Sequence, residues 1–417
     1  MISVVLFRQN LRVIDNRALV AAAAHGDPVL PVAVWDTERH ERPWCGWASM
    51  GSHREQFLVE ALTDLNQQLH GNLCVAAGTM ADVVSHLAQH LPAMRLITNA
   101  VPGQYEADEL QAIARICDTH GHEVTVMNDT TLLDDIQPEL VPNGFTKFRQ
   151  HVEKRVKVAA PDKAPTNLNF ANIPATITQA QLPAAQHQDP IMRGGETAAW
   201  QHLDEYMWQT NAIAHYKKTR NRLIGRHVSA KLSMALAHGC VSARSIYAEI
   251  KRYEKQVQKN DSTYWLFFEL LWRDFFHYQC AKHHKHWYQH GGFLQPGIAS
   301  PPVDNAKCQA WITGTTENAF VNANMLELVQ TGYMSNRGRQ NVASYLIHDL
   351  GQDWRWGAAA FEHYLIDADV ASNIGNWMYI AGVGNSNQPR VFNVPEQAKR
   401  YDASGAFVNH WLQGKLF

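Results

Sequence analysis

The sequence predicts an α/β fold in two parts, an N-terminal five-stranded, parallel, doubly wound domain and a C-terminal all-α domain. Short apolar runs alternate with helical stretches over the first ~130 residues, a proline-rich stretch follows, and the rest has helical spacing without β alternation. A chain of 417 residues is also too long for one hydrophobic core. We therefore place the α/β domain at 1–130, a connector at 131–195 and the helical domain at 196–417.

Five short apolar runs with the composition of β-strands are the predicted strands: "ISVVLF", "VLPVAVW", "LCVAAG", "RLITNA" and "HEVTVMN". Between them lie helical stretches such as "NRALVAAAAH", "SHREQFLVEALTDLNQQLH" and "QYEADELQAIARICDTH". Strands that alternate with helices pair in parallel, because each helix carries the chain back to the same end of the sheet. Neither a GxGxxG motif nor a P-loop follows the first strand, so dinucleotide or ATP binding at that turn is unsupported.

The connector is predicted from "VAAPDKAPTNLNFANIPATITQAQLPAAQHQDP", which has five prolines and little periodicity. Such a composition favours an extended segment that crosses the surface between two domains. After "RGGETAAW" the apolar residues recur at helical spacing to the end of the chain, which predicts the all-α domain.

Composition excludes several classes of protein. The net charge of −2 excludes a globally basic nucleic-acid binder, so such contacts require a local patch. The six cysteines form no CxxC pair, which argues against a zinc ribbon or iron–sulfur cluster and favours a reducing compartment, the cytoplasm. The four histidines of "KHHKHWYQH" fit no standard zinc spacing, so we expect a polar loop there and no metal site. No apolar run is long enough to span a membrane. The N-terminal apolar run is short and is followed directly by an arginine, which indicates a first strand and not a signal peptide.

A basic run without any acid, "YKKTRNRLIGRHVSAKLSMALAHGC", occupies residues 216–240. A solvated basic face is the ordinary interpretation of such a run. However, Ser229, Lys231 and Ser233 stand just before an apolar helix, where hydroxyls and backbone N–H groups suit phosphate oxygens. Both interpretations stay open from the residues alone.

The stretch "STYWLFFELLWRDFFHY" (262–278) predicts a helix that is apolar on nearly every face and therefore buried. Glu269, Arg273 and Asp274 lie within it, and buried charges persist only when they are paired or hydrogen-bonded. Glu269 and Arg273 are four residues apart, which favours an ion pair within the helix. An interpretation of equal weight is that Glu269 hydrogen-bonds a ligand in a dry pocket.

Two further segments carry polar side chains next to tryptophans. "TGYMSNRGRQNVASYLIHDLGQDWRW" (331–356) has the pattern of an amphipathic helix with a turn at each end. "LIDADVASNIGNWMYIAGVGNSNQ" (365–388) is interpreted as a polar loop with Asp367, Asp369 and Asn373, followed by Gly375 and Trp377. Two aspartates without a third ligand are a poor metal signature. They could instead accept hydrogen bonds from ribose hydroxyls or from N–H groups of a heterocycle.

Eight stretches together resemble the photolyase/cryptochrome family over essentially the whole chain, and within it the DASH-type cryptochromes. They are "FRQNLRVIDNRAL", "GGETAA", "YKKTRN", "AKLS", "STYWLFFELLWRDFF", "NANMLELVQTGYMSNRGRQNVAS", "DLGQDWRWG" and "NWMYIAGVGN". The resemblance implies that the helical domain is an FAD-binding domain that holds the cofactor in a folded, U-shaped form.

The resemblance also assigns residues to the cofactor. Those that match the family's positions around the FAD phosphates are Tyr216, Ser229, Lys231 and Ser233. Those that match the inner wall of the FAD pocket are Glu269, Arg273, Asn336 and Arg339. Asp367 and Asp369 match the pair beside the isoalloxazine and ribitol, and Asn373 matches the residue that faces flavin N5.

Trp377 and Trp354 match the inner and middle tryptophans that pass electrons from the surface to the excited flavin. The outer tryptophan has no match, because Pro301 and Pro302 stand where it is expected. The role of this outer tryptophan could instead be taken by Trp356, Trp287 or a tyrosine.

The activity implied is light-driven repair of cyclobutane pyrimidine dimers, preferentially in single-stranded DNA, by electron transfer from excited reduced FAD. Glu269 would hydrogen-bond the dimer, Trp272 and Tyr379 would pack against it, and Arg337 would join residues 217–226 in a basic DNA-facing patch. The alternative is a blue-light photoreceptor cryptochrome that signals through a partner without repair. We expect a monomer.

The resemblance does not decide whether the chain also binds a second, light-harvesting cofactor. Folates such as methenyltetrahydrofolate are usual in DASH-type members, and Glu106 and Glu109 lie near the expected contact.

Overall fold

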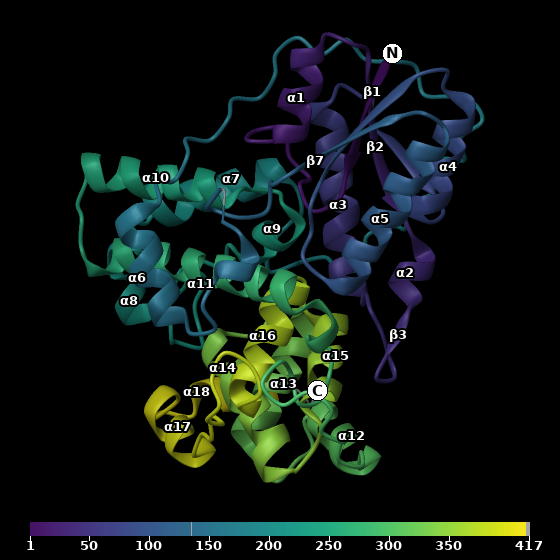
Figure 1. The fold of residues 1–417 in the computed structure, drawn as a ribbon. Helices are drawn as coiled ribbons and strands as arrows, with labels where there is room; N and C mark the ends of the chain where they lie inside the picture. The colour runs from purple at the N-terminus through teal and green to yellow at the C-terminus, as the bar shows by residue number, and fades with distance from the viewer. Residues whose placement is uncertain (135, 414–417) are drawn as a thin grey trace.

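The computed structural model describes residues 1–134 and 136–413. Its N-terminal part is built around a five-stranded sheet, which Figure 1 shows flanked by helices. The strands are β1 (Ile2–Phe7), β2 (Val29–Trp35), β5 (Cys74–Ala77), β6 (Met94–Asn99) and β7 (Glu123–Met127). Every neighbouring pair is parallel, and the order is β5-β2-β1-β6-β7, so the direction of winding reverses at β1. All five predicted strands are confirmed.

Helices cover both faces of this sheet, as the alternating pattern predicts. α1 (Arg17–His25) and α3 (Ser52–Gln68) pack on one face, and α4 (Met80–His90) and α5 (Gln104–Thr119) pack on the other. The core on the α1 and α3 side is continuous with the core of the helical domain. The short helix α2 (Thr37–Glu41) and the hairpin of β3 (Pro43–Trp44) and β4 (Trp47–Ala48) were not predicted.

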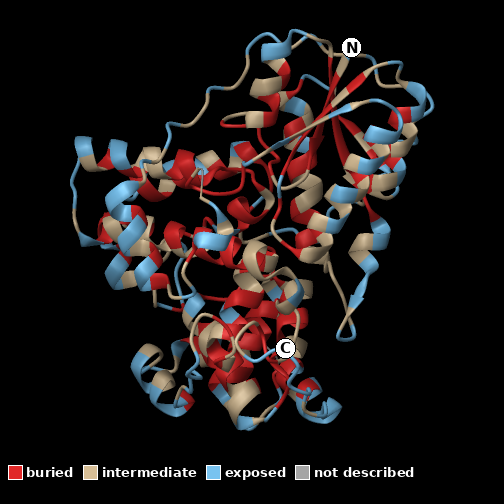
Figure 2. Cartoon of the chain, in the orientation of Figure 1, coloured by how far each residue is buried: buried red, intermediate tan, exposed pale blue. Residues whose placement is uncertain are grey.

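The C-terminal part is helical, as predicted, and α11 (Asp261–His283) runs through its buried centre (Figure 2). Its other elements are α7 (Glu196–Asp204), η2 (Glu205–Gln209), η3 (Ala212–His215), α8 (Tyr216–Thr219), α9 (Ser233–His238), α10 (Ala243–Gln256), η4 (His284–His286), α12 (Asn305–Thr313), α13 (Ala319–Thr331), α14 (Asn336–Ser344), η5 (Tyr345–Asp349), α15 (Trp354–Tyr364), α16 (Val370–Ala381), α17 (Val394–Tyr401) and α18 (Ala406–Gln413). α11 packs against α8, α10 and α16. Asn260 starts it with a capping box that satisfies its first backbone N–H groups.

The predicted connector is only partly extended. Besides the short turn η1 (Pro138–Leu140), it contains the helix α6 (Phe145–Arg155), which buries Phe145, Phe148 and Val152 against the core. The prediction of an extended segment is wrong there, because these three apolar residues are spaced to lie on one helical face. Residues 156–195 contain no helix and cross the surface of the α/β domain, where Gln179 bridges Ala76 on the edge strand β5.

Two other segments differ from their predictions. Residues 331–356 form α14 and η5, then a break at Gly351, whose φ of 68° is in the left-handed region, and α15 starts only at Trp354. The predicted single helix is therefore wrong. Residues 370–381 form α16 instead of a polar loop, since the Asp369 side chain accepts a hydrogen bond from the Ser372 backbone and caps this helix.

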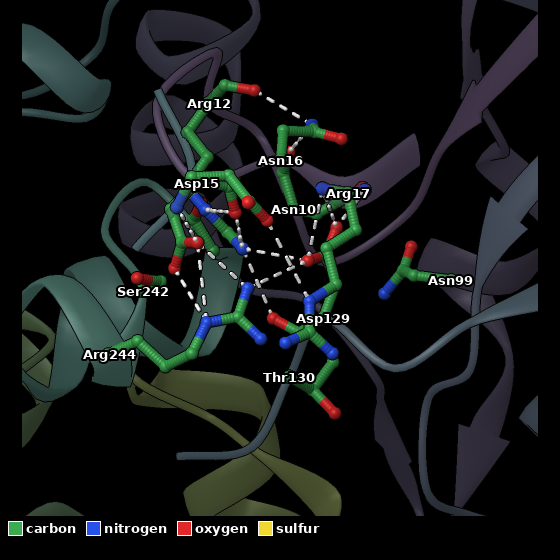
Figure 3. Close-up of polar contacts among 12 residues, drawn as sticks. Asn10, Arg12, Asp15, Asn16, Arg17, Asn99, Asp129, Thr130, Ser242 and Arg244 are labelled. Carbon is green, nitrogen blue, oxygen red and sulfur yellow. Dashed lines mark hydrogen bonds and ion pairs between the residues drawn. The ribbon is translucent and has the colours of Figure 1, made fainter. Parts of the chain in front are cut away.

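A buried ionic cluster joins the two domains (Figure 3). The Arg244 guanidinium from α10 donates to both carboxylate oxygens of Asp15, at 2.8 and 3.0 Å. Arg12 donates to the Asp15 carbonyl at 2.8 Å and to the Gly239 carbonyl at 3.0 Å. Asp129 completes the cluster, 3.4 Å from Arg12 and 3.5 Å from Arg244, and all four charged side chains are at most 1% exposed.

Arg244→Ala is expected to lower the free energy of unfolding by about 3–5 kcal/mol, because it leaves buried carboxylates without their partner. Urea denaturation followed by circular dichroism measures this change. Arg252→Ala is the matched control in the same helix, since the Arg252 side chain is 52% exposed and its pair with Glu249 should contribute at most about 1 kcal/mol. Equal losses in both variants would contradict a stabilising role for the interdomain cluster.

Candidate functional site

A cavity of about 480 Å³ lies between α8, α9, α11, α14 and α16 in the helical domain. Its lining includes all eleven side chains that were predicted to bind the cofactor: Tyr216, Ser229, Lys231, Ser233, Glu269, Arg273, Asn336, Arg339, Asp367, Asp369 and Asn373. Trp272, Trp377 and Tyr379 line it as well. Residues spread over more than 160 positions of the sequence are thus brought to one cavity.

One end of the cavity is suited to an anion. Ser229 and Lys231 come from the turn that leads into α9, and Ser233 is the first residue of that helix. Lys231 has a φ of 48°, and its ammonium group lies 5.2 Å from the centre of the Tyr333 ring and donates to the Gly225 carbonyl at 3.1 Å. Burial lowers the pKa of Lys231, against the opposing field of Glu327. A cation and two hydroxyls at one place are what phosphate oxygens require.

Asp367 has one carboxylate oxygen that is free to bind a ligand. Its Oδ2 accepts from Arg339 Nη2 at 2.9 Å. Its Oδ1 is buried and has no hydrogen-bond partner among the described residues, while the side chain lines the cavity. A buried acceptor of this kind requires a donor, such as a ribose hydroxyl or an N–H of a heterocycle. This orphaned oxygen is the local observation that a polar cofactor would explain.

Asp369 is held in its charged form beside the same cavity. Burial alone would raise its pKa, but the His277 imidazole, whose Nε2 lies 3.0 Å from Asp369 Oδ2, holds that pKa well below its usual range. Asn373, one turn further along α16, donates from its amide nitrogen to the Ala358 carbonyl at 2.8 Å. The carboxylates and this amide therefore stand on rigid, hydrogen-bonded positions.

Glu269 does not form the predicted ion pair with Arg273. It pairs with Arg220, which lies 49 residues earlier in the basic run, and Arg273 instead donates to the backbone carbonyls of Thr130 and Leu236. Burial raises the pKa of Glu269, and the Arg220 guanidinium acts against that rise. The Glu269 side chain keeps about a third of its surface exposed, at 32%, so it remains accessible from the cavity.

Aromatic side chains form the wall next to Glu269. One face of the Trp272 ring stacks on Phe145 of α6, with centroids 3.7 Å apart and an interplanar angle of 10°. Tyr379 lies 6.3 Å from Trp272 and carries the Arg390 guanidinium 5.0 Å above its ring. Phe145 was missed as a site residue, because it lies in the predicted connector.

The predicted residues Arg337 and Trp354 lie outside the lining of the cavity. Arg337 stacks over Tyr401 at 4.6 Å and donates to Asn221 at 3.3 Å, next to the exposed basic residues Arg222 and Arg226. Trp354 is buried, and its indole N–H donates to the His290 carbonyl at 2.8 Å.

Glu106 and Glu109 lie in the first turns of α5 and are already paired with arginines. Glu106 Oε1 accepts from Arg39 at 2.6 Å, and Glu109 pairs with Arg8 at 2.5 Å. The second oxygen of Glu106, Oε2, is buried and has no partner among the described residues.

Within the described ranges, no helix has the length and hydropathy needed to cross a membrane. The same residues contain no group of three or more histidine, cysteine or acidic side chains placed to hold a metal ion. All six cysteines are free, and Cys45 on the β3–β4 hairpin is the exposed one.

Comparison with known proteins accounts for both domains. Residues 3–166 match the family model for DNA photolyase, and residues 265–414 match the model for the FAD binding domain of DNA photolyase. A cryptochrome DASH of Natronomonas pharaonis is 39% identical, with 98% of this chain and 90% of the relative covered. One of Xenopus laevis is 37% identical, with 98% and 82% covered.

Solved structures give the same result. A cryptochrome of Synechocystis sp. superimposes with a TM-score of 0.94 at 36% identity, covering 99% of this chain and 89% of the other. A class III photolyase of Agrobacterium tumefaciens has a TM-score of 0.84 at 26% identity, with 99% and 86% covered.

Proposed function

Since the chain belongs to the photolyase/cryptochrome family, and within it to the DASH-type cryptochromes, we propose that it repairs cyclobutane pyrimidine dimers, preferentially in single-stranded DNA. The reaction would be driven by light through electron transfer from reduced FAD. The observation that carries the proposal is Glu269, an accessible carboxyl group between an aromatic wall and a cavity equipped for a phosphate-bearing cofactor.

The residues of the cavity fit FAD. Ser229, Lys231 and Ser233, with Tyr216 beside them, would hold its phosphates, and the unpartnered Asp367 oxygen would accept from a hydroxyl or ring N–H. FAD, when bound, supplies light absorption and one-electron chemistry, and the protein supplies position and electrostatics. The remaining wall residues, which orient the cofactor in this proposal, are Arg273, Asn336, Arg339, Asp369 and Asn373.

The aromatic wall supports binding of a base that has left the DNA stack. Trp272, backed by Phe145, and Tyr379 would pack against the dimer, while Glu269 would hydrogen-bond its pyrimidine edge. Extruding a nucleotide costs a few kcal/mol, and the cost is smallest when the DNA is single-stranded. This difference is the physical reason for the proposed preference for single strands.

Phosphates of the DNA would bind to the basic surface formed by residues 217–226 and Arg337. Lys218, Arg222 and Arg226 are exposed there, although the whole chain has a net charge of −2. Binding should therefore weaken steeply with salt, because phosphate contacts release condensed counterions.

For electron supply we propose Trp377, which is 2% exposed and lines the cavity, as the first donor. The resemblance assigns the next step to Trp354, but the ring partners of Trp377 among the described residues are Phe361 and Trp311. We further propose a folate antenna near Glu106 and Glu109, a monomeric state, and a cytoplasmic location in keeping with six free thiols.

Asp367→Asn is expected to weaken FAD binding by about tenfold or more, because a hydrogen bond to a charged acceptor contributes about 1.5–3 kcal/mol. The FAD released on heating, measured per mole of protein after dialysis, gives the occupancy. Asp349→Asn is the matched control, since Asp349 is exposed in the same domain and lies outside the cavity lining. Full occupancy in both variants would contradict the assignment of Asp367.

The direct test of function is illumination of chemically reduced, FAD-loaded protein with single-stranded and duplex oligonucleotides that contain one thymine dimer. Faster repair of the single strand supports the proposal. FAD binding and photochemistry without repair of either substrate would favour the alternative, a blue-light photoreceptor.

A further inference from the structure

Four tryptophans form a continuous series of ring contacts from the cavity to the molecular surface. Trp377 contacts Trp311 with ring centroids 6.2 Å apart, Trp311 contacts Trp356 at 6.0 Å, and Trp356 contacts Trp47 at 5.5 Å. Each pair is edge-to-face, with interplanar angles between 69° and 76°. The rings come from α16, α12, α15 and β4, so this contact series exists only in the folded chain.

The two inner rings of the series are buried, and the two outer rings are partly exposed. Trp377 and Trp311 are 2% and 0% exposed, whereas Trp356 and Trp47 are half-buried. The Trp311 indole donates to the Val342 carbonyl at 2.9 Å, which fixes its ring between Trp377 and Trp356. At the surface, Trp47 also contacts the Tyr364 ring at 5.4 Å.

The local backbone supports these contacts. Gly357 lies under the Trp377 ring, and a β-carbon there would overlap the indole, so glycine permits the close approach of α15 and α16. The β3–β4 hairpin is tied to α15, because His363 Nδ1 lies 2.9 Å from the Ala48 carbonyl and the Gly51 N–H donates to the His363 carbonyl at 2.9 Å. Trp47 is thus held against Trp356 across the boundary between the two domains.

The position that the resemblance assigns to an outer tryptophan holds Pro301 and Pro302. Among the described residues, the ring partners of Trp377 are Phe361 and Trp311, and Trp354 is not one of them. A route to the surface through indoles in contact therefore leaves Trp377 by way of Trp311.

We propose that Trp311, Trp356 and Trp47 conduct electrons from the surface to Trp377, with Trp47 on the β3–β4 hairpin as the surface exit. This inference rests on the proposed function. With FAD bound and excited, Trp377 would be oxidised by one electron, and it would be re-reduced by an electron passed on in turn from Trp47, Trp356 and Trp311. An external thiol would return one electron to the oxidised Trp47, release one proton to water and become a thiyl radical, and two such radicals would couple to a disulfide. Electron transfer falls off steeply with distance, so rings in contact provide the fast steps.

Trp47→Phe is expected to slow the bleaching of the blue FAD band, under light with a thiol reductant, by about tenfold or more. Trp44→Phe is the matched control: Trp44 pairs with Trp47 across the same hairpin, is also half-buried, and packs on Tyr288 instead. The control should bleach at the parent rate. Trp311→Phe, in the middle of the series, should be slow as well.

A second measurement locates the oxidised ring. After illumination without the thiol, peptide mass spectrometry should find oxidised tryptophan at Trp47 in the parent and at Trp356 in Trp47→Phe. Simple core packing of these indoles would not produce this shift. Parent-rate bleaching in Trp47→Phe, with the oxidation mark near Trp354, would overturn the inference.

The proposed function is tested separately. All variants should bind FAD and, once reduced with dithionite, repair dimers like the parent. If they do so and bleaching is independent of Trp47, only the electron route is wrong, whereas failure of the reduced parent to repair would contradict the proposed function itself.

Discussion

Trp377→Phe is expected to reduce light-driven reduction of FAD by an external thiol by about a hundredfold or more, equivalent to ~2.7 kcal/mol or more in the barrier. The reason is geometric: Trp377 lines the cavity and also touches the buried Trp311 ring. Phenylalanine keeps most of the apolar volume but is far harder to oxidise than an indole. Bleaching of the blue flavin band under steady illumination measures the rate.

Two controls separate electron supply from structural damage. Trp44→Phe should bleach like the parent, because Trp44 packs on Tyr288 and neither residue belongs to the cavity lining. Trp377→Phe reduced with dithionite should still repair dimers, since in the proposed reaction the electron comes from the cofactor that has already been reduced. Rapid photoreduction of the Trp377→Phe protein would show that another residue is the first donor.

Glu269→Ala is expected to lower the yield of dimer splitting per absorbed photon by about tenfold or more, while FAD and DNA affinity stay close to those of the parent. A hydrogen bond to the dimer becomes stronger when the dimer carries an extra electron in a water-poor site, so its loss acts on the charged intermediate. Repair per photon under single-turnover conditions, together with DNA binding in the dark, measures both quantities.

Glu269→Gln provides the matched control for this residue. Glutamine keeps hydrogen-bonding groups at the same place but removes the charge that pairs with Arg220. We expect it to retain more repair than the alanine variant. Equal, parent-like yields in both variants would remove Glu269 from the chemistry and leave it as the ion-pair partner of Arg220.

The five strands of the parallel sheet were predictable because each is a short apolar run bounded by helical patterns. The helices α2, α6 and α16 were not. In α6 the three buried apolar residues are followed by a proline-rich stretch that dominates the composition. In α16 the polar start and the glycines after it suggest a loop, although Asp369 with Ser372 three residues later is a recognisable helix start.

The site could be predicted as a set of residues but not as a set of contacts. The spacing of Glu269 and Arg273 correctly places them one turn apart on α11. The Glu269 carboxylate nevertheless pairs with Arg220, which lies 49 residues away in the sequence. Likewise, nothing in the sequence places Trp311 of α12 against Trp377 of α16, because that contact depends on how the helices pack. The sequence pattern predicts on which face of a helix or strand a residue lies, but the side chains that it contacts depend on how the helices and strands pack.

The measurement that tests the central claim most directly is dimer splitting by reduced, FAD-loaded protein under blue or near-UV light. The substrate is a single-stranded oligonucleotide with one cyclobutane thymine dimer, and chromatography follows the restored strand. The account predicts repair that requires light, is faster than on the matched duplex, and falls sharply in Glu269→Ala. A parent protein that binds FAD, is fully reduced and leaves the dimer intact under illumination would contradict it.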